Sequence, residues 1–297
     1  MSDGLRPYLD LLRLHFAPAW PLLFSSGTLL ASKSYPGLTW TLVLTVVLIA
    51  FFGFSAGLVL NDYVDRDLDR RDVDRRLSRY WRPFGTRPVA QGTVSPARAR
   101  VLAVGLGVLA LLAILTLPFP HRVYVVSIMA WSYLAEYAYQ RLKRRQRYPV
   151  AQVLGRTDFA LFPVAGYLAL GHPDIGALLY FLFFYPFALA HLGINDMADI
   201  TNDRARGLMT IPVLYGVPGA SRWVLWSSFV HGGTALLFAS LLGLPGRIGL
   251  AGGLGLVVVA NLLIRRSPGE DAALRALPCM HGAMVLYAGG IILDALV

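Results

Sequence analysis

Apolar stretches long enough to cross a membrane follow one another along most of this chain. A hydrocarbon core about 30 Å thick requires about 20 apolar residues in a helix. Gly-rich apolar runs of this length do not suit barrel strands, so helices are the structure that these stretches can form. The first of them is the weakest, because it is short and contains two prolines. We expect nine spans, near residues 17–32, 40–60, 101–119, 122–139, 151–170, 177–194, 222–242, 247–264 and 276–296.

Composition agrees with a polytopic membrane protein. The 297 residues are 56% hydrophobic, with a mean hydropathy of +0.56, and 15% are charged. A soluble domain would have about a quarter of its residues charged. The single cysteine, Cys279, excludes an intramolecular disulfide and a cysteine metal cluster. We therefore predict an all-α fold, with residues 1–297 forming one membrane domain of nine helices around a central cavity that cytoplasmic loops cap.

The net charge of +10 is distributed unevenly between the two predicted membrane faces. With a cytoplasmic N-terminus, 24 Lys and Arg residues lie on the cytoplasmic side, and Lys33, Arg122 and Arg247 lie on the other. This is the positive-inside pattern. It predicts an integral cell-membrane protein whose C-terminus is outside. The excess of basic charge suits anionic lipids or an anionic substrate, and it does not indicate nucleic acid as a partner.

Two similar carboxylate-rich words follow predicted spans on the basic side. NDYVDRDLD occupies residues 61–69 and NDMADITND occupies residues 195–203, and both fit N-D-x-x-D-x-x-x-D. The aspartates of each word are spaced i, i+3 and i+7, which predicts that they share one face of a helix. Asp67 and Asn202 fall outside these stripes and are expected to be solvated. The repetition also predicts an internal duplication relating spans 2–4 to spans 6–8.

Two facing carboxylate stripes predict a divalent-cation site. Aspartates so close together repel one another unless cations neutralise them, and Mg²⁺ prefers hard oxygen ligands and bridges carboxylates to phosphate oxygens. Such a site can hold a diphosphate and stabilise it as a leaving group. The alternative, an ordinary polar surface at two helix ends, does not account for the matching words. The predicted metal ligands are Asp62, Asp65, Asp69, Asp196, Asp199 and Asp203.

These motifs resemble those of the UbiA superfamily of intramembrane prenyltransferases. NDYVDRDLD fits the first motif of the family, and NDMADITNDRARGLMTIPVLYG is similar to the second. YQRLKR, residues 139–144, looks like the Y-x-x-x-K stretch that follows the fourth span. RPVAQGTVS, residues 87–95, matches a further R-P-x-x-x-G-x-[IVL]-S element after about eight extra residues, and Arg82-Pro83 is a competing match. The resemblance covers essentially the whole chain.

The resemblance implies transfer of a prenyl group from a polyprenyl diphosphate to a nucleophilic acceptor, with Mg²⁺ as cofactor. It implies catalytic roles for Asp62, Asp65, Asp196 and Asp199, and Asp62 is one option for the base that receives the acceptor proton. The residues expected to bind diphosphate are Asn61, Arg13, Arg87, Tyr139, Lys143, Arg144 and Asn195. The acceptor is expected to be aromatic or to belong to a lipid pathway, as in quinone, chlorophyll or archaeal-type lipid biosynthesis.

Several features allow more than one interpretation. A terpene cyclase on the same fold would use the diphosphate site without an acceptor, and a polyprenyl-lipid binding or transport protein would bind without releasing diphosphate. Glu136 and His191 are intramembrane polar residues that can face substrate or be satisfied in the core. The aromatic run 180–187 can line a prenyl tunnel, although packing is the favoured interpretation. Arg156 and Asp158 are expected to pair across helices, and the lengthened segment 70–86 can cap the acceptor site.

Overall fold

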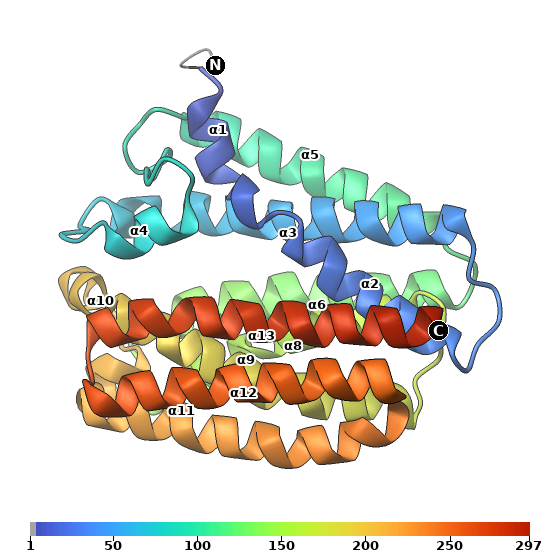
Figure 1. Ribbon diagram of the computed structural model, residues 1–297. Coiled ribbons are helices and arrows are strands. Elements are labelled where there is room, and N and C mark those ends of the chain that lie inside the picture. The colour runs from blue at the N-terminus through green and yellow to red at the C-terminus, as the bar shows by residue number, and fades with distance from the viewer. Residues whose placement is uncertain (1–3) are drawn as a thin grey trace.

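The computed structural model describes residues 4–297, and the regular structure of this part of the chain is entirely helical (Figure 1). Fifteen helical elements follow one another along it. They are α1 (Arg6–Leu11), η1 (Leu14–Phe16), α2 (Ala19–Ser32), α3 (Trp40–Asp69), α4 (Arg76–Trp81), α5 (Pro96–Leu115), α6 (His121–Leu142), α7 (Val150–Gly155), α8 (Thr157–Leu168), α9 (Ile175–Ala198), α10 (Ile200–Arg206), α11 (Ile211–Phe238), η2 (Ala239–Leu241), α12 (Leu244–Arg266) and α13 (Glu270–Leu296).

Six helices of the described residues are long and apolar enough to cross a membrane: α3, α5, α9, α11 together with η2, α12 and α13. The all-helical prediction is therefore confirmed, and the protein is an integral membrane protein. The count of nine spans is not confirmed. Helices α2 and α8 lie where spans were expected, but they have 14 and 12 residues, and α6 does not meet the same criterion of length and apolarity.

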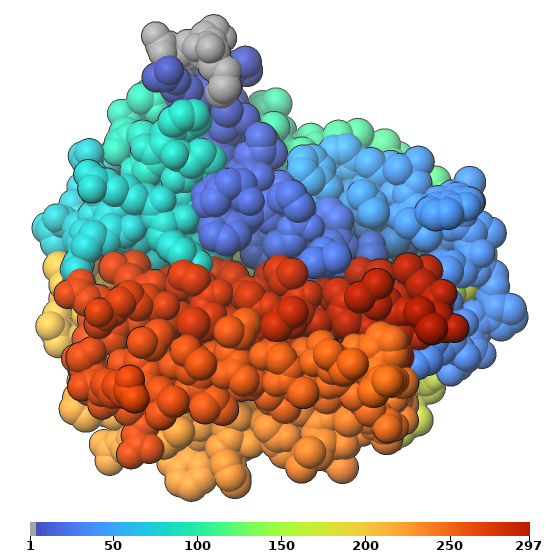
Figure 2. Space-filling model, in the orientation of Figure 1, coloured from blue at the N-terminus to red at the C-terminus, as the bar shows by residue number. Residues whose placement is uncertain are grey.

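The long helices run roughly parallel, and the carboxylate words lie at one end of the bundle. Figure 1 shows α4 and α10 at the same end, with the C-terminus at the opposite end. Helix α13 packs against α2, α9 and α12, and α3 packs against α5. In the space-filling view α13 forms a continuous band, with the N-terminal third of the chain on one side and α12 on the other (Figure 2). The core is thus built from helix–helix contacts.

Helix boundaries follow from capping residues in the sequence. Thr39, Ser95 and Asp174 are N-caps whose side chains accept a hydrogen bond from the backbone N–H three residues on, which is what short polar side chains do at this position. Helix α10 ends at Gly207, which has a positive φ of 72°, and Leu208 N–H then donates to the Asp203 carbonyl. The caps therefore fix where the elements around the motifs begin and end.

Glycines bring α2 and α8 into backbone contact. A Cβ atom added at Gly27 would lie 1.9 Å from the carbonyl oxygen of Pro163, and one added at Gly166 would lie 1.8 Å from that of Phe24. Small residues allow such close approach of membrane helices. The Thr28 hydroxyl donates to the Gly166 carbonyl at 2.7 Å and adds a polar contact at the same place. Helices α2 and α8 are thus packed closely against each other.

Gly166→Ala is expected to destabilise the protein by about 2 kcal/mol, because the new methyl group forces two backbones apart. Gly105→Ala in α5 is the control, since a Cβ there has no atom within 4 Å. Thermal unfolding in detergent measures both variants. Equal midpoints for the two variants would contradict the proposed close contact.

Candidate active site

The first carboxylate word occupies the last turns of α3, which continues without a break to Asp69. Asp62, Asp65 and Asp69 are all buried, as a shared helix face predicts. The side chain of Asp67 is 66% exposed, so its predicted solvation is confirmed. One continuous helix therefore carries the first stripe into the bundle.

The second word is not on one helix, so the predicted i, i+3, i+7 stripe is wrong for it. Helix α9 ends at Ala198, and Asp199 has φ −114° and ψ 10° between α9 and α10. Asn202 is buried rather than solvated: its amide oxygen accepts the N–H groups of Val73 and Asp74, and its amide nitrogen donates to Asp199 at 2.7 Å. Asn202 thereby ties the break to the segment after α3, a contact that periodicity alone does not reveal.

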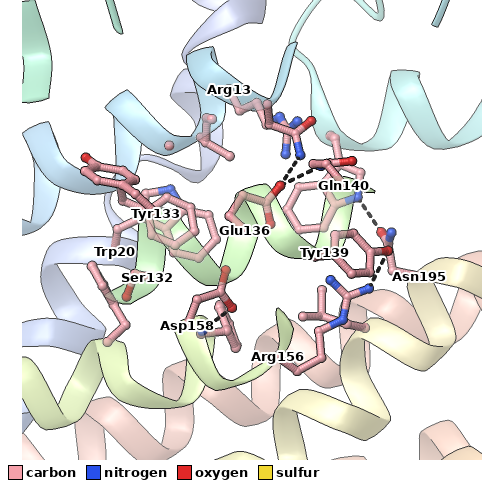
Figure 3. A pocket seen from close by; sticks show the side chains of 18 of the residues that line it. Arg13, Trp20, Ser132, Tyr133, Glu136, Tyr139, Gln140, Arg156, Asp158 and Asn195 are labelled. Atoms are coloured by element: carbon pink, nitrogen blue, oxygen red, sulfur yellow. Dashed lines mark hydrogen bonds between the residues drawn. The ribbon is translucent and has the colours of Figure 1, made fainter. Parts of the chain in front are cut away.

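One cavity of about 330 Å³ receives most of the predicted site residues. The side chains in Figure 3 converge on this cavity, with Glu136, Tyr139, Arg156 and Asn195 around its polar part. The predicted residues that line it are Asn61, Asp65, Asp69, Asp196, Asp199, Asp203, Arg13, Arg87, Tyr139, Lys143 and Asn195. Its apolar wall includes Trp20, Phe24, Ile49, Phe54, Leu58, Ile114, Val125, Ile128, Met129 and Phe162. The cavity is thus polar at the motif end and apolar beyond.

Basic side chains from two segments, the end of α6 and the loop between α4 and α5, pair with the first stripe. Lys143 Nζ lies 3.0 Å from Asp65 Oδ2, and Arg87 Nη1 lies 2.8 Å from Asp69 Oδ2. Arg144 Nη2 lies 3.6 Å from Asp65 Oδ1, but its side chain is 35% exposed and does not line the cavity. The expected cations are therefore at the motif, with Lys143 and Arg87 facing the cavity and Arg144 at its rim.

Arg206, which the motif analysis missed, joins the two words. Its guanidinium lies 3.3 Å from Asp69, 3.2 Å from Asp199 and 3.8 Å from Asp203, and it also pairs with Asp72. Burial opposes its charge, but these carboxylates raise its pKa above the ordinary value. The sequence signal was the second arginine of DRARG, directly before the glycine that ends α10.

Asp62 lies away from the cavity that its neighbours line. Both of its oxygens accept hydrogen bonds from Arg82, each at 2.8 Å, and Arg13 Nη2 lies 3.4 Å from Asp62 Oδ1. Arg82 is 2% exposed and also donates to the Asp10 carbonyl. Asp62 therefore connects α3 to the segment after α4. Arg82, which the sequence offered as the competing match to Arg87, lines the cavity and holds this carboxylate.

The polar wall opposite α3 comes from α6, α7 and α9. Arg156 donates to the Tyr139 hydroxyl at 3.0 Å and to Asp196 Oδ1 at 3.2 Å. The expected Arg156–Asp158 pair is therefore replaced by an Arg156–Asp196 pair, because α9 brings the second motif within reach of this guanidinium. Asp158 instead lines the cavity.

The residues whose roles the sequence left open fall into two groups: some line the cavity and others are buried in the core. Glu136 and His191 line the cavity, and Glu136 accepts hydrogen bonds from Asn61 at 2.7 Å and Gln140 at 2.6 Å (Figure 3). The aromatic run 180–187 does not line it, and Phe183, Phe184 and Phe187 in this run are completely buried. Packing is thus the role that the structure gives to these aromatic rings.

The donor set of the cavity fits a hard divalent cation. Five aspartates from two motifs face it, and Asp65 Oδ1 is buried and accepts no hydrogen bond within the described chain. Burial and the neighbouring Asp199 and Asp196 raise the pKa of Asp203 to about 8, so its ionised form needs further positive charge nearby. Among residues 4–297, no three acidic, His or Cys side chains are already gathered closely enough to hold a metal by themselves.

Known proteins with similar sequences are prenyl-transferring enzymes by name. Protoheme IX farnesyltransferase of Aquifex aeolicus is 31% identical over 55% of this chain and 52% of its own length, so the match spans about half of that relative. Digeranylgeranylglyceryl phosphate synthase of Thermococcus sibiricus is 26% identical over 74% of this chain and 71% of its own. A 4-hydroxybenzoate octaprenyltransferase of Neisseria meningitidis is 28% identical over 81% of this chain and 76% of its own.

Solved structures share the fold at low sequence identity. A UbiA homologue from Aeropyrum pernix matches with a TM-score of 0.76 and 18% identity over 93% of this chain and 97% of its own. A UbiA homologue from Archaeoglobus fulgidus bound to GPP and Mg²⁺ matches with a TM-score of 0.70 and 17% identity, over 96% of this chain and 99% of its own.

A match to a protein-family model agrees with the similar sequences and the similar structures. The model of the UbiA prenyltransferase family matches residues 19–284, which include both carboxylate words, the YQRLKR stretch and every helix from α2 to α12. This covers most of the cavity wall as well as the motifs. The chain belongs to the UbiA prenyltransferase family.

Proposed function

We propose that this protein is an Mg²⁺-dependent intramembrane prenyltransferase that moves a prenyl group from a polyprenyl diphosphate to an aromatic or lipid-pathway acceptor. One observation carries the proposal: five motif aspartates and several cationic side chains line a single cavity whose wall becomes apolar beyond them. A diphosphate with an apolar tail has the same polarity pattern. The family relationship supports the same reaction class.

In this proposal the two carboxylate words hold Mg²⁺ together with the donor diphosphate. Mg²⁺ would neutralise charge that grows on the leaving diphosphate as its C–O bond breaks. The residues that would hold the ion are Asp65, Asp69, Asp196, Asp199 and Asp203, with Asn61 and Asn195 beside them. Lys143, Arg87 and Arg13 supply positive charge to the phosphate oxygens, and Tyr139 is held over this region by Arg156.

The apolar wall would receive the prenyl chain. Trp20 and Phe54 stack at 3.7 Å between ring centroids, and with Phe162 they form an aromatic surface in the cavity. Such a surface excludes water, which would otherwise capture an allylic cation. Segment 70–86 contains α4, and its Leu77 and Trp81 line the cavity, which supports the proposal that this segment covers the acceptor side. In this proposal the site faces the cytoplasm, with the C-terminus outside.

A prenyl-transfer assay with the full-length protein in liposomes tests this function. Labelled geranylgeranyl diphosphate is supplied with Mg²⁺ and a panel of acceptors that includes 4-hydroxybenzoate, protohaem and geranylgeranylglyceryl phosphate. We expect prenylated product and diphosphate release with at least one acceptor, and loss of both after EDTA, restored by Mg²⁺. Cyclic product from the donor alone would instead indicate a terpene cyclase. Donor binding without diphosphate release would contradict an enzymatic role.

A further inference from the structure

A line of three polar side chains runs from the cavity past a groove on the side of the bundle to the half-buried Tyr80. His191 of α9 lines the cavity, and its Nε2 lies 3.1 Å from Nε2 of His281 on α13. Nδ1 of His281 lies 2.5 Å from the hydroxyl of Tyr80, at the end of α4. His281 also lines the lateral groove, together with Phe16, Ala19 and other residues of η1, α2 and α13. The line thus connects two separate spaces.

The hydrogen-bond chemistry of this line allows two proton arrangements. A neutral imidazole has one N–H, so only one of the two facing Nε2 atoms can be the donor. When His191 donates through Nε2, its Nδ1 is a free acceptor, and His281 donates from Nδ1 to Tyr80. In the reverse arrangement Tyr80 donates to His281, His281 donates to His191, and His191 Nδ1 carries the proton. The two arrangements differ by the passage of one proton along the line.

The inner end of the line has an unused nitrogen. His191 is 1% exposed, and its Nδ1 makes no hydrogen bond within the part of the chain that the structure describes. A buried polar atom without a partner is costly, which indicates a ligand at this position. The ring packs against Phe159 and Phe187, at 5.7 Å and 5.9 Å between centroids.

The position of His191 suits the reacting carbon rather than the diphosphate. It lies one helical turn before Asn195, which lines the cavity beside the second motif and accepts a hydrogen bond from Trp81 at 2.8 Å. Four residues of helix correspond to about 6 Å along the axis. If the diphosphate is held at the motifs, the first prenyl carbon lies inward of it, on the level of His191.

We propose that His191 is the general base of the reaction and that the acceptor of this enzyme is an alcohol, with an aliphatic hydroxyl group as the nucleophile; this inference rests on the proposed function. The acceptor oxygen forms a bond to the prenyl carbon while the bond from that carbon to diphosphate breaks, and diphosphate leaves with the electron pair. The acceptor proton passes to His191 Nδ1, and the Nε2 proton of His191 passes to His281. His281 gives its Nδ1 proton to the oxygen of the half-buried Tyr80 as the Tyr80 hydroxyl proton leaves to solvent.

Single-turnover transfer from geranylgeranyl diphosphate to geranylgeranylglyceryl phosphate tests the relay. Tyr80→Phe keeps the ring but removes the hydroxyl, and we expect it to lower the rate about 10-fold; His191→Gln should lower it about 100-fold. In both variants the donor KM should stay within twofold. The proton inventory in mixed H₂O and D₂O should be curved for the natural protein and change shape in Tyr80→Phe.

The matched control is Tyr287→Phe, because His231 Nε2 lies 2.8 Å from the Tyr287 hydroxyl in a buried pair that does not line the cavity. This variant should keep the natural rate and proton inventory. A Tyr80→Phe protein that behaves like Tyr287→Phe would overturn the relay while leaving the proposed function intact. If the natural protein transfers to 4-hydroxybenzoate or protohaem but never to the alcohol, the hydroxyl-acceptor assignment is overturned. A natural protein that releases no diphosphate with any acceptor overturns both proposals.

Discussion

Replacing Asp65 or Asp199 with asparagine is expected to lower the prenyl-transfer rate about 1,000-fold, which is about 4 kcal/mol in the barrier. The two residues lie on different motifs but line the same cavity. Asparagine keeps the side-chain size and removes the charge that a divalent cation requires. The loss should be partly compensated at high Mg²⁺ concentration, because the remaining aspartates still offer ligands.

Asp67→Asn is the matched control for these variants. Asp67 belongs to the same word, but its side chain is 66% exposed and pairs with Arg70 at the surface. It should retain the natural rate and the natural Mg²⁺ requirement. Full activity in Asp65→Asn and Asp199→Asn, measured at the same Mg²⁺ concentration as the control, would contradict the assignment of the metal-diphosphate site to these motifs.

The first motif could be read from the sequence because its geometry is local. Residues three and four apart share a face of any helix, and α3 supplies that helix through Asp69. Lys143 was also within reach of motif analysis, and it pairs with Asp65 across 78 residues of sequence. For Asp65 and Asp69, one helix determines the arrangement, and periodicity is sufficient to predict it.

The second motif shows where periodicity fails. The backbone breaks at Asp199, between α9 and α10, and Arg206 at the end of α10 pairs both with Asp199 at this break and with Asp203 on its own helix. Asn202 stabilises the break through backbone groups of residues 73 and 74, which are about 130 positions earlier in the chain. Contacts between residues so far apart in the sequence depend on how the helices pack together, and they cannot be predicted from the spacing of residues within the motif.

The span count was less predictable for a related reason. The sequence shows how apolar a stretch is, but the length of a helix depends on local breaks. Span 151–170 is divided at Arg156 into α7 and α8, and the guanidinium of Arg156 binds Asp196 and Tyr139 at that break. The functional contact and the interrupted helix are thus the same feature. The proposed duplication of spans 2–4 and 6–8 stays a prediction.

Asp62 shows how the edge of a helical stripe can have a different role. Asp62 lies about 60° round the helix from Asp65, at 100° per residue, while Asn61 lies about 40° from Asp65 on the other side. The cavity faces Asn61 and Asp65, so Asp62 meets Arg82 instead. Burial alone would lower the pKa of Arg82, but the charge and hydrogen bonds of Asp62 raise it above the ordinary value. We propose that this pair positions the covering segment and that Asp62 does not bind metal.

Asp62→Ala is expected to destabilise the protein by about 3–5 kcal/mol, because it leaves the Arg82 guanidinium buried without its carboxylate. Arg82→Ala should cost a similar amount, and the double variant should cost clearly less than the sum, as for two residues in direct contact. Asp67→Ala, which breaks the exposed pair with Arg70, should cost at most about 1 kcal/mol. Thermal unfolding in detergent measures all four proteins.

The Mg²⁺ concentration for half-maximal transfer separates a positioning role from metal binding at Asp62. Asp62→Asn should lower stability and maximal rate but leave this concentration within about twofold of the natural value, whereas Asp65→Asn should raise it. The expectation follows from the geometry: both oxygens of Asp62 are held by Arg82 at 2.8 Å, while Oδ1 of Asp65 accepts no hydrogen bond within the described chain. An Asp62→Asn protein of natural stability that needs about tenfold more Mg²⁺ would instead make Asp62 a ligand, because only a group that binds the ion changes the affinity for it while the fold is unaffected.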